Sequence, residues 1–466
     1  MTMIFHRVQT PGIAQISYLI GDDAAGTAAV IDPRPNVEIY LKLARQFGVT
    51  ITHVFETHIH ADFMSGAREL VNRLGEARLY ASGEGGAEYG FEVEKIRDKD
   101  SFELGSVLLT ARHTPGHTPE HMSYLVAEKD TPDAPWGIFT GDSLFVGSAG
   151  RPDLLGDEET EELTEQLFHT LRDFYLKLDD GIIIYPCHGA GSACGADIGD
   201  RPMSTIGFER GSNEFLQYDD LEEFKTFIQE NAPPEPHHYK RLKKTNSEGP
   251  PVLRGLPQVP GLPPQEFRKA WKKGDSQLVD TRQMLAFGGG HIPDAVNLGP
   301  RPELSVWAGQ MLSADRPLLL VVEDETDLDE VVWHFVYTGF VKFTGYLVGG
   351  MKAWDNHGLP VQRLTQISVQ ELKEKASSLQ ILDVRAPDEW EAGHIPQARH
   401  FYVADLRDHN NGVDGVAKDK PVAVYCDSGY RADIAASILQ SRGFEDVRNV
   451  LGSWQAWNRA GYPVEK

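Results

Sequence analysis

Short apolar runs that end in histidine or aspartate recur through the first 230 residues. Examples are AAVIDP (from Ala28), ITHVFETH (from Ile51), GIFTGDSLF (from Gly137) and GIIIYPCHG (from Gly181). Runs of this length and β-branched content predict strands, whereas VEIYLKLARQFG (from Val37) has the apolar spacing of an amphipathic helix. This part of the chain therefore predicts sheets covered by helices, with functional side chains on loops at the strand ends.

The second half of the chain repeats itself. The stretch LVDTRQMLAFGGGHIPDAVNL matches ILDVRAPDEWEAGHIPQARHF, and the alignment pairs Asp280 with Asp383 at a constant offset of 103. In each copy, apolar runs such as PVAVYC alternate with helical patterns such as RADIAASILQSRGF, which is typical of an α/β domain with a parallel sheet. Two tandem copies of one small domain are therefore expected, at 262–362 and 363–466.

Between these regions lies a segment rich in proline, glycine and charge, PPEPHHYKRLKKTNSEGPPVLRGLPQVPG, at 233–261. Such a composition does not build a compact core and predicts an extended linker on the surface. A length of 466 residues also fits about three domains. We therefore expect a first domain at 1–232, then the linker, then the two copies.

Composition narrows the setting in which the protein works. Apolar residues make up 41% of the chain and charged residues 24%, as in ordinary globular proteins. There is no run of 18 apolar residues and the first residues do not resemble a secretory signal, so neither a membrane span nor secretion is expected. The net charge of -24 disfavours nucleic acid and anionic membranes as partners. Three cysteines in so long a chain form no disulfide framework, which predicts a cytoplasmic location.

The strongest candidate chemistry is a set of histidines and aspartates at the predicted strand ends. The motif THIHAD places His58, His60 and Asp62 two residues apart, and alternate side chains of an extended chain point the same way. Three further candidates each follow an apolar run, namely His117, Asp142 and His188. Imidazole and carboxylate groups suit zinc or iron. The pattern therefore predicts a metal site.

This pattern resembles the metallo-β-lactamase superfamily, whose signature is His-x-His-x-Asp-His followed by a distant His, Asp and His. The resemblance covers about the first 230 residues and implies an αββα fold. Phe63 stands where the signature has its last histidine. In dinuclear hydrolases of the family, such as glyoxalase II, that histidine helps to hold the second metal. Because a phenyl ring cannot donate a lone pair, one metal is expected here.

Two histidines and one carboxylate with open positions form the facial triad of non-haem Fe(II) oxygenases. Within the superfamily this arrangement marks the persulfide dioxygenases. The resemblance implies one Fe(II) per chain, with zinc as a possible substitute, held by His58, His117 and Asp142. It implies that three other residues orient ligands, water or substrate, or hold a second metal: His60, Asp62 and His188.

Three residues near the pattern have two interpretations each. Arg151, in GRPD, either pairs with a nearby acid or contacts the substrate. Cys187, next to the last candidate histidine, is either a small buried side chain or a metal ligand. Cys194, in a glycine-rich loop, is either buried in the same way or forms a mixed disulfide or persulfide with the substrate.

The second copy contains a candidate reactive cysteine. The run PVAVY leads into CDSGYR and then into a helical pattern, so Cys426 lies at a strand end on a loop that opens a helix. Backbone N–H groups at a helix N-terminus and a nearby guanidinium lower a thiol pKa and stabilise a persulfide anion. The rest of the predicted catalytic loop comprises Asp427, Ser428, Gly429, Tyr430 and Arg431.

This six-residue loop, with the DVR, GHIP and AW-G-P motifs, resembles the rhodanese sulfurtransferases over about 365–466. The resemblance matches Asp383 and Arg385 to the DVR motif, and His394 to GHI in a structural role. Asp427 is a departure, because thiosulfate-using members often carry a basic residue there and an acid repels a dianion. Thiosulfate as donor is therefore in question, whereas persulfide and sulfite chemistry stays open.

The first copy lacks this loop. Val322 aligns with Cys426 and Asp327 aligns with Arg431, within the acidic segment VVEDETDLDE. A segment with no nucleophile and this much negative charge does not hold a sulfur anion. We therefore expect the first copy to be an inactive rhodanese that serves packing, spacing or self-association.

Together these resemblances imply a fused persulfide dioxygenase and sulfurtransferase of sulfide detoxification. The metal domain would oxidise a small-molecule persulfide with O₂ to sulfite and thiol. Cys426 would pass sulfane sulfur to sulfite to form thiosulfate, or run the exchange in reverse. A homo-oligomer is expected, because the middle domain has no catalytic role. Two alternatives are a dinuclear zinc thioester hydrolase like glyoxalase II and a persulfide-sensing module.

Overall fold

The computed structural model describes residues 3–154, 156–409 and 412–466. Internal contacts divide the chain into two compact units. The first comprises Met1–Leu256 with Val336–Gly339, and the second comprises Pro257–Phe335 with Phe340–Lys466. Among the described residues, no helix combines the length and the apolar character needed to cross a bilayer.

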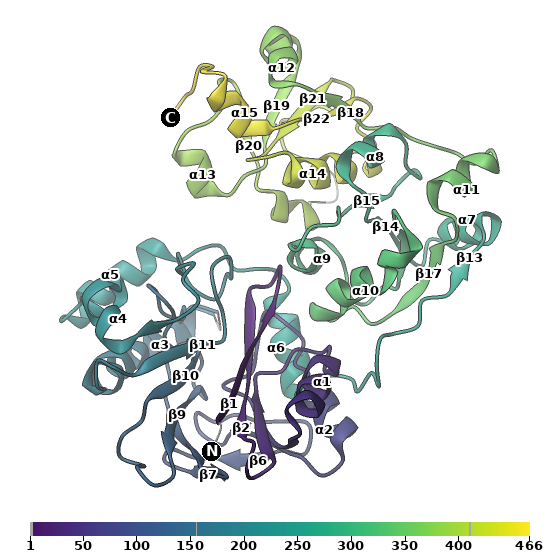
Figure 1. Ribbon diagram of the computed structural model, residues 1–466. Coiled ribbons are helices and arrows are strands. Elements are labelled where there is room, and N and C mark those ends of the chain that lie inside the picture. The colour runs from purple at the N-terminus through teal and green to yellow at the C-terminus, as the bar shows by residue number, and fades with distance from the viewer. Residues whose placement is uncertain (1–2, 155, 410–411) are drawn as a thin grey trace. The chain divides into compact units, whose positions relative to one another are not determined.

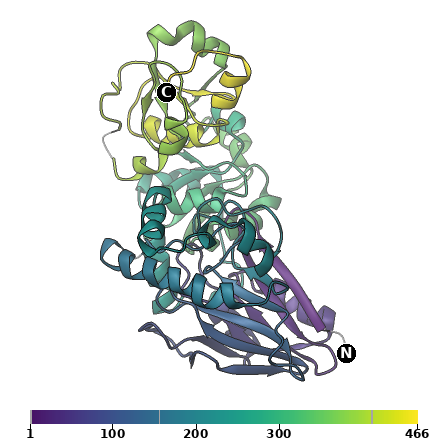
Figure 2. The ribbon, with the colours of Figure 1, turned by 90° about the vertical axis from the view of Figure 1, so that its left-hand side faces the viewer.

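The first unit contains two six-stranded sheets with helices on their outer faces (Figures 1 and 2). The first sheet has the strand order β1-β2-β3-β4-β5-β6, with β1 (Met3–Thr10), β2 (Gln15–Asp22), β3 (Thr27–Ile31), β4 (Thr50–Phe55), β5 (Arg78–Ser82) and β6 (Glu94–Ile96). The second has the order β12-β11-β10-β9-β8-β7, with β7 (Ser101–Leu104), β8 (Val107–His113), β9 (Met122–Glu128), β10 (Gly137–Gly141), β11 (Ile183–Pro186) and β12 (Ser204–Thr205). The helices are α1 (Glu38–Phe47), α2 (Ala67–Leu74), α3 (Asp157–His169), η1 (Thr170–Phe174), η2 (Tyr175–Lys177), α4 (Ile206–Ser212), η3 (Glu214–Leu216), α5 (Leu221–Asn231) and α6 (Tyr239–Glu248).

The layers follow from the alternation of side chains along the strands. In β2, Ile20 faces the core between the two sheets, whereas its neighbour Leu19 faces the core shared with α1 and α2. In β10, Phe139 faces the core between the sheets and Ile138 faces the core shared with α3 and α5. Three apolar cores therefore separate four layers, which confirms the predicted αββα arrangement.

Strand ends position the polar motifs, as the sequence predicted. Strand β4 ends at Phe55 just before THIHAD, β10 ends at Gly141 just before Asp142, and β11 ends at Pro186 just before Cys187. Strand β10 runs parallel to β11, so both carboxyl ends lie at the same edge of the second sheet. This edge brings together residues that are far apart in the chain.

The segment 233–261 differs from the extended linker that its composition predicted. Helix α6 occupies its middle and belongs to the first unit. The helix buries Tyr239, Leu242 and Asn246, which recur at the three- and four-residue spacing of one helical face. Prolines on both sides of this short helix make the segment resemble a linker, although its centre is amphipathic.

The second unit contains two five-stranded sheets. One has the order β13-β17-β16-β14-β15, with β13 (Gly261–Leu262), β14 (Gln277–Asp280), β15 (Val296–Asn297), β16 (Leu318–Val321) and β17 (Phe343–Leu347). The other has the order β18-β22-β21-β19-β20, with β18 (Thr365–Ile367), β19 (Gln380–Asp383), β20 (Arg399–His400), β21 (Val422–Tyr425) and β22 (Val447–Val450). The helices are α7 (Pro264–Lys273), α8 (Met284–Gly289), α9 (Leu304–Met311), η4 (Glu325–Asp327), α10 (Leu328–Tyr337), α11 (Gly350–Asn356), α12 (Val369–Lys375), η5 (Ala376–Ser378), α13 (Pro387–Glu391), η6 (Val403–Arg407), α14 (Tyr430–Ser441) and α15 (Ser453–Arg459).

The two sheets confirm the internal repeat. Both have the same strand order relative to the chain, and every strand pair in both is parallel. The repeated Asp-x-Arg motif also makes the same contacts twice. Arg282 donates to Asp280 and to the carbonyl oxygen of Gly290, and in the second copy Arg385 makes the matching contacts with Asp383. This motif is therefore a structural feature of the domain.

Candidate metal centre and cysteine loop

Three predicted metal ligands converge in the first unit. They come from the loop after β4, the loop between β8 and β9, and the loop after β10. The Nε2 atoms of His58 and His117 lie 3.7 and 3.6 Å from Oδ2 of Asp142. All three side chains are buried, and their ligand atoms lie within 4.8 Å of one another. One divalent ion could contact all three atoms.

The protonation of the two histidines suits metal binding. Nδ1 of His117 donates to the carbonyl oxygen of Arg151, which leaves its Nε2 with a free lone pair. The hydroxyl of Thr57 donates to Asp32 and so accepts from Nδ1 of His58, which leaves the Nε2 of that ring unprotonated as well. That Nε2 atom is buried without a hydrogen-bond partner among the described residues.

The pKa shifts of the two histidines also favour neutral rings with a free Nε2 lone pair. Burial, followed by the neighbouring histidines, holds the pKa of His58 well below its usual value, and burial also lowers the pKa of His117. Two neutral imidazoles and one carboxylate therefore face one point. This donor set fits a divalent zinc or iron ion.

His121 also belongs to this centre, although the sequence analysis did not single it out. Its Nε2 accepts the backbone N–H of Asp142 at 3.0 Å, and its ring stacks on His58 with centroids 5.1 Å apart. Gly141 makes the close approach possible, because a Cβ there would lie 2.5 Å from Nε2 of His121. The motif HTPGHTPEH held the signal, since it places a third histidine four residues after His117.

His188 orients the carboxylate ligand. Its Nδ1 lies 2.7 Å from Oδ1 of Asp142, and its Nε2 lies 2.7 Å from Oδ2 of Asp62. Burial opposes protonation of the ring, but the two carboxylates outweigh it and raise the pKa of His188 to about 10. The ring therefore donates to both acids and links the carboxylates of Asp62 and Asp142.

His60 is directed to a different pair of acids. Its Nε2 lies 2.8 Å from Glu56 and 3.1 Å from Asp32. Burial disfavours the charged ring, yet these carboxylates prevail and raise the pKa of His60 well above its usual value. Phe63 is fully buried beside this ring, with centroids 4.4 Å apart, and its ring also lies 6.4 Å from that of His188. The phenyl ring thus fills space next to the acids and histidines that could hold a second metal.

The two cysteines near the centre are buried thiols. Burial raises the pKa of Cys187 and of Cys194 well above the usual value, so both are protonated. Sγ of Cys194 lies 3.6 Å from the hydroxyl of Tyr239 on α6. Its Sγ is also within 4.8 Å of ligand atoms of Asp62 and His188, so these three form a further group that could hold an ion.

Arg151 has its guanidinium fully engaged. It pairs with Asp153, with Nε 2.7 Å from Oδ1, and NH2 donates to the carbonyl oxygen of Pro233 at 2.6 Å. The side chain is 5% exposed. These contacts fit the structural interpretation of Arg151 better than a substrate contact, because they tie the loop after Asp142 to the segment that precedes α6.

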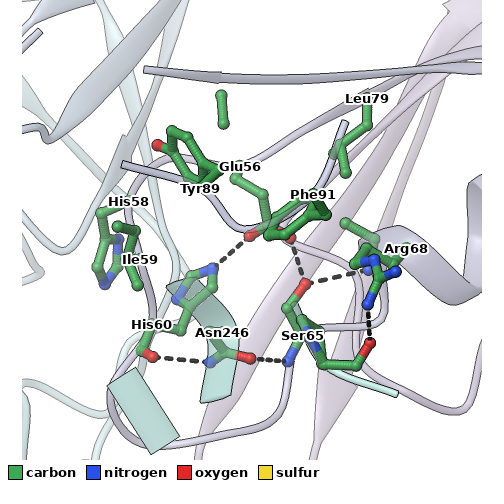
Figure 3. A pocket seen from close by; sticks show the side chains of 13 residues that line it. Glu56, His58, Ile59, His60, Ser65, Arg68, Leu79, Tyr89, Phe91 and Asn246 are labelled. Carbon is green, nitrogen blue, oxygen red and sulfur yellow. Dashed lines mark hydrogen bonds and ion pairs between the residues drawn. The ribbon is translucent and has the colours of Figure 1, made fainter. Parts of the chain in front are cut away.

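A pocket opens beside the candidate metal ligands (Figure 3). His58 and Ile59 line it on one side, and the aromatic rings of Tyr89 and Phe91 lie across from them. Figure 3 shows Glu56 and Arg68 among its polar groups. A mostly apolar pocket with a few polar side chains is the usual form of a small-molecule site.

In the second unit, Cys426 follows β21 and the loop ends in α14, as predicted. The backbone N–H of Gly429 donates to Sγ of Cys426 at 3.1 Å, and the cysteine's own N–H donates to Ser453 at 3.1 Å. Gly429 has a φ of 112°, which favours glycine at this turn. Cys426 is 1% exposed. A backbone N–H that points at the sulfur suits a sulfur anion.

The charges around this loop differ from the predicted picture. Arg431 is held by Glu389 of α13 in a two-pronged ion pair with distances of 2.5 and 2.7 Å. Glu389 was not anticipated, because it lies in the helix after β19 and reaches the loop only in the folded domain. Asp427 accepts from Gln455 at 2.6 Å, and both Asp427 and Ser428 are half-buried. The charge of Arg431 is therefore balanced by a carboxylate from outside the loop.

The first copy has an apolar side chain where the second has its cysteine. Val322 is buried directly after β16, and the turn that follows is capped by Asp324, which accepts the N–H of Thr326. This segment offers no thiol, and the hydroxyl of Thr326 in it donates to Asp324. His394 in the second copy lies on the GHI turn and pairs in backbone with Glu465, which agrees with its predicted structural role.

Comparisons with known proteins match both halves of the chain. The model for the metallo-beta-lactamase superfamily matches residues 12–188, and the model for the rhodanese-like domain matches residues 263–357 and 368–460. The persulfide dioxygenase ETHE1 of Bos taurus is 26% identical over 232 residues, which covers 50% of this chain and 83% of the relative. A hydroxyacylglutathione hydrolase of Synechococcus is 29% identical over 219 residues, covering 43% of this chain and 84% of the relative.

A crystal structure extends the similarity beyond the first domain. The metallo-beta-lactamase from Staphylococcus aureus subsp. aureus COL is 31% identical to this chain, with a TM-score of 0.67. The match covers 74% of this chain and 99% of that one. With the fold and both family matches in agreement, the chain belongs to the metallo-β-lactamase superfamily and carries two rhodanese-like domains after that fold.

Proposed function

We propose that this protein is a persulfide dioxygenase joined to a rhodanese-type sulfurtransferase. The observation that carries the proposal is the convergence of two neutral imidazoles and one carboxylate, from His58, His117 and Asp142, beside the buried Phe63. This donor set leaves open positions on a single ion. The similarity to the persulfide dioxygenase of Bos taurus supports the same activity.

The first reaction consumes oxygen: R–S–SH + O₂ + H₂O gives R–SH, sulfite and two protons. Fe(II) in the triad would supply open positions for O₂ and for the sulfur anion. The protein's own residues hold this geometry. His121 and His188 fix Asp142 from its backbone and its carboxylate, and the pocket next to His58 takes the organic part of the thiol.

The second reaction takes place at Cys426. A persulfide transfers its outer sulfur to the cysteine, and the resulting cysteine persulfide passes it to sulfite to form thiosulfate. Gly429 and the opening of α14 hold the sulfur anion between the two steps. The first rhodanese-like copy takes no part in this covalent chemistry. Three free cysteines fit a reducing cytoplasm, where we propose that the chain acts as a homo-oligomer.

Oxygen uptake tests the proposal. The full chain, loaded anaerobically with Fe(II), is given glutathione persulfide in an oxygen electrode. We expect oxygen consumption and sulfite release, both lost in His117→Ala and both kept in His169→Ala, because His169 is exposed on α3. An iron-loaded wild-type protein that consumes no oxygen with this substrate would contradict the proposal.

A second candidate is a dinuclear thioester hydrolase. It is favoured by the group Asp62, His188 and Cys194, whose ligand atoms lie within 4.8 Å of one another, and by the similarity to a hydroxyacylglutathione hydrolase. In this case Cys194 would replace the histidine that Phe63 displaces. Hydrolysis of a glutathione thioester by zinc-loaded protein, without oxygen uptake by iron-loaded protein, would favour this candidate.

A further inference from the structure

The cysteine loop of the second copy has no unbalanced cation of its own. Glu389 neutralises Arg431, and Asp427 adds a negative charge that Gln455 contacts without cancelling. A doubly charged acceptor such as sulfite would therefore approach Cys426 against an unfavourable field. Another part of the second unit must supply the positive charge if the loop is to bind such an anion.

The first copy reaches this loop directly. The hydroxyl of Tyr430, which is 8% exposed, donates to the carbonyl oxygen of Gly299 at 3.1 Å. A Cβ at Gly299 would lie 3.3 Å from the tyrosine ring, which is tighter than most such contacts. On the other side of the loop, Sδ of Met284 lies 3.6 Å from the Cβ position of Gly429. Residues of the inactive copy therefore contact two members of the cysteine loop, Gly429 and Tyr430.

Arg301 is a cationic residue of the first copy that lies beside this contact. The guanidinium carbon of Arg301 lies 4.9 Å from the centroid of the Tyr430 ring. The backbone N–H of Arg301 also donates to the carbonyl oxygen of Gly299 at 2.8 Å, so the tyrosine and the arginine share one anchor. The side chain is exposed and forms no ion pair in the described part of the chain, while the carboxylate of Glu303 acts on the same tyrosine with the opposite sign.

We propose that Arg301 of the inactive copy is a binding residue for the anionic sulfur acceptor at Cys426. The inactive copy then completes the active site of its neighbour, and Arg301 supplies the charge that Asp427 and Glu389 remove. This inference rests on the proposed sulfur transfer. In the step concerned, the lone pair on the sulfur of sulfite attacks the outer sulfur of the cysteine persulfide, the S–S bond breaks, and thiosulfate leaves with Cys426 as thiolate. The total charge of minus three is the same on both sides.

Two acceptors of different charge test the role of Arg301. The full chain is assayed at neutral pH with glutathione persulfide as donor and either sulfite or hydrogen cyanide, which is mostly uncharged, as acceptor. For Arg301→Gln we expect kcat/KM with sulfite to fall about tenfold and the salt dependence to weaken, with little change for cyanide. Arg301→Lys should retain most of the activity with sulfite.

Arg268→Gln is the matched control, because it removes the same charge from an exposed position on α7 of the same copy. The proposal would be overturned if Arg301→Gln and Arg268→Gln behaved alike with sulfite, or if Arg301→Gln slowed both acceptors equally. If the wild-type chain transferred sulfur to neither acceptor, the proposed function of Cys426 would fail instead. The two failures are therefore distinguishable.

Discussion

At the scale of single residues, the position of a proton decides what each histidine can do. His58 and His117 use Nδ1 as a donor and keep Nε2 free to face Asp142. His188 donates from both nitrogens to carboxylates, so an ion could bind to it only after one of these protons had left. The same residue type therefore serves as ligand at two positions and as orienting group at a third.

We expect His121 to raise the affinity of the site for Fe(II) without binding the ion itself. His121→Ala leaves the buried backbone N–H of Asp142 without its acceptor. Of the two histidines that hold Asp142 in place, only His188 then remains. We expect Fe(II) affinity to fall by about 10–100-fold, as for other groups that hold a ligand in place. Competition with a chelator measures this affinity. An unchanged affinity, equal to that of His169→Ala, would show that the contact does not matter.

Asp433 is expected to make the second unit less stable as the pH rises. Burial raises the pKa of Asp433 to about 7, while Asn449 and Gln366 donate to one of its oxygens. The folded state thus binds more protons than the unfolded state between about pH 4 and pH 7, so the free energy of unfolding falls across this window by up to a few kcal/mol. Asp433→Asn should remove this loss.

Denaturant unfolding at pH 5 and pH 7.5 checks the effect of Asp433. Seven of the eight tryptophans lie beyond residue 257, so tryptophan fluorescence reports mainly on the second unit. Asp419→Asn, at an exposed position of the same copy, is the control. Equal changes with pH in wild type, Asp433→Asn and Asp419→Asn would contradict the prediction.

The sequence predicted those site residues that belong to recognisable motifs. His58, His117 and Asp142 each follow an apolar strand, so their convergence could be inferred from the pattern alone. Glu389 could not be found in this way, because its role depends on a contact with Arg431 across the fold. The engagement of Arg151 by Asp153 was one of two interpretations that the sequence left open.

At the scale of elements, helix α6 supports the first motif of the metal domain. Nδ2 of Asn246 donates to the carbonyl oxygens of His60 and Phe63, both at 2.7 Å, and its Oδ1 accepts the N–H of Ser65 at 2.9 Å. A short helix outside the two sheets thus holds the loop that carries the first ligand. Composition alone did not predict this helix, because α6 lies between proline-rich stretches and has only three buried residues.

Asn246→Ala should loosen this loop. The substitution leaves two buried carbonyl groups and one N–H without partners, which we expect to destabilise the loop by about 2–3 kcal/mol. Hydrogen exchange followed by mass spectrometry would show faster exchange in peptides that cover 58–66. Lys244→Ala, at an exposed position of the same helix, serves as control. Identical exchange in the two variants would refute the supporting role of α6.

Considered as a whole, the molecule carries its two candidate sites in different units. The candidate metal centre lies in the first unit and Cys426 lies in the second. The repeat at an offset of 103 predicted the two rhodanese-like domains, and the strand orders confirm them. What the sequence did not predict is the contact between Tyr430 and Gly299, because it joins two domains that look independent in the sequence.

This separation predicts the behaviour of a cysteine variant. Cys426→Ser should keep oxygen uptake with glutathione persulfide at close to the wild-type rate, and it should lose thiosulfate formation almost completely. Sulfite would then accumulate in place of thiosulfate. Both products can be measured in one reaction by ion chromatography. Loss of oxygen uptake in Cys426→Ser would mean that the two reactions are not divided between the units as proposed.

We expect the first unit to bind a single ion with His58, His117 and Asp142. Metal analysis of the full chain, combined with oxygen uptake on glutathione persulfide, tests it most directly. We expect one iron per chain and oxygen consumption that scales with iron content. Two metal ions per chain, with thioester hydrolysis and no oxygen uptake, would contradict it.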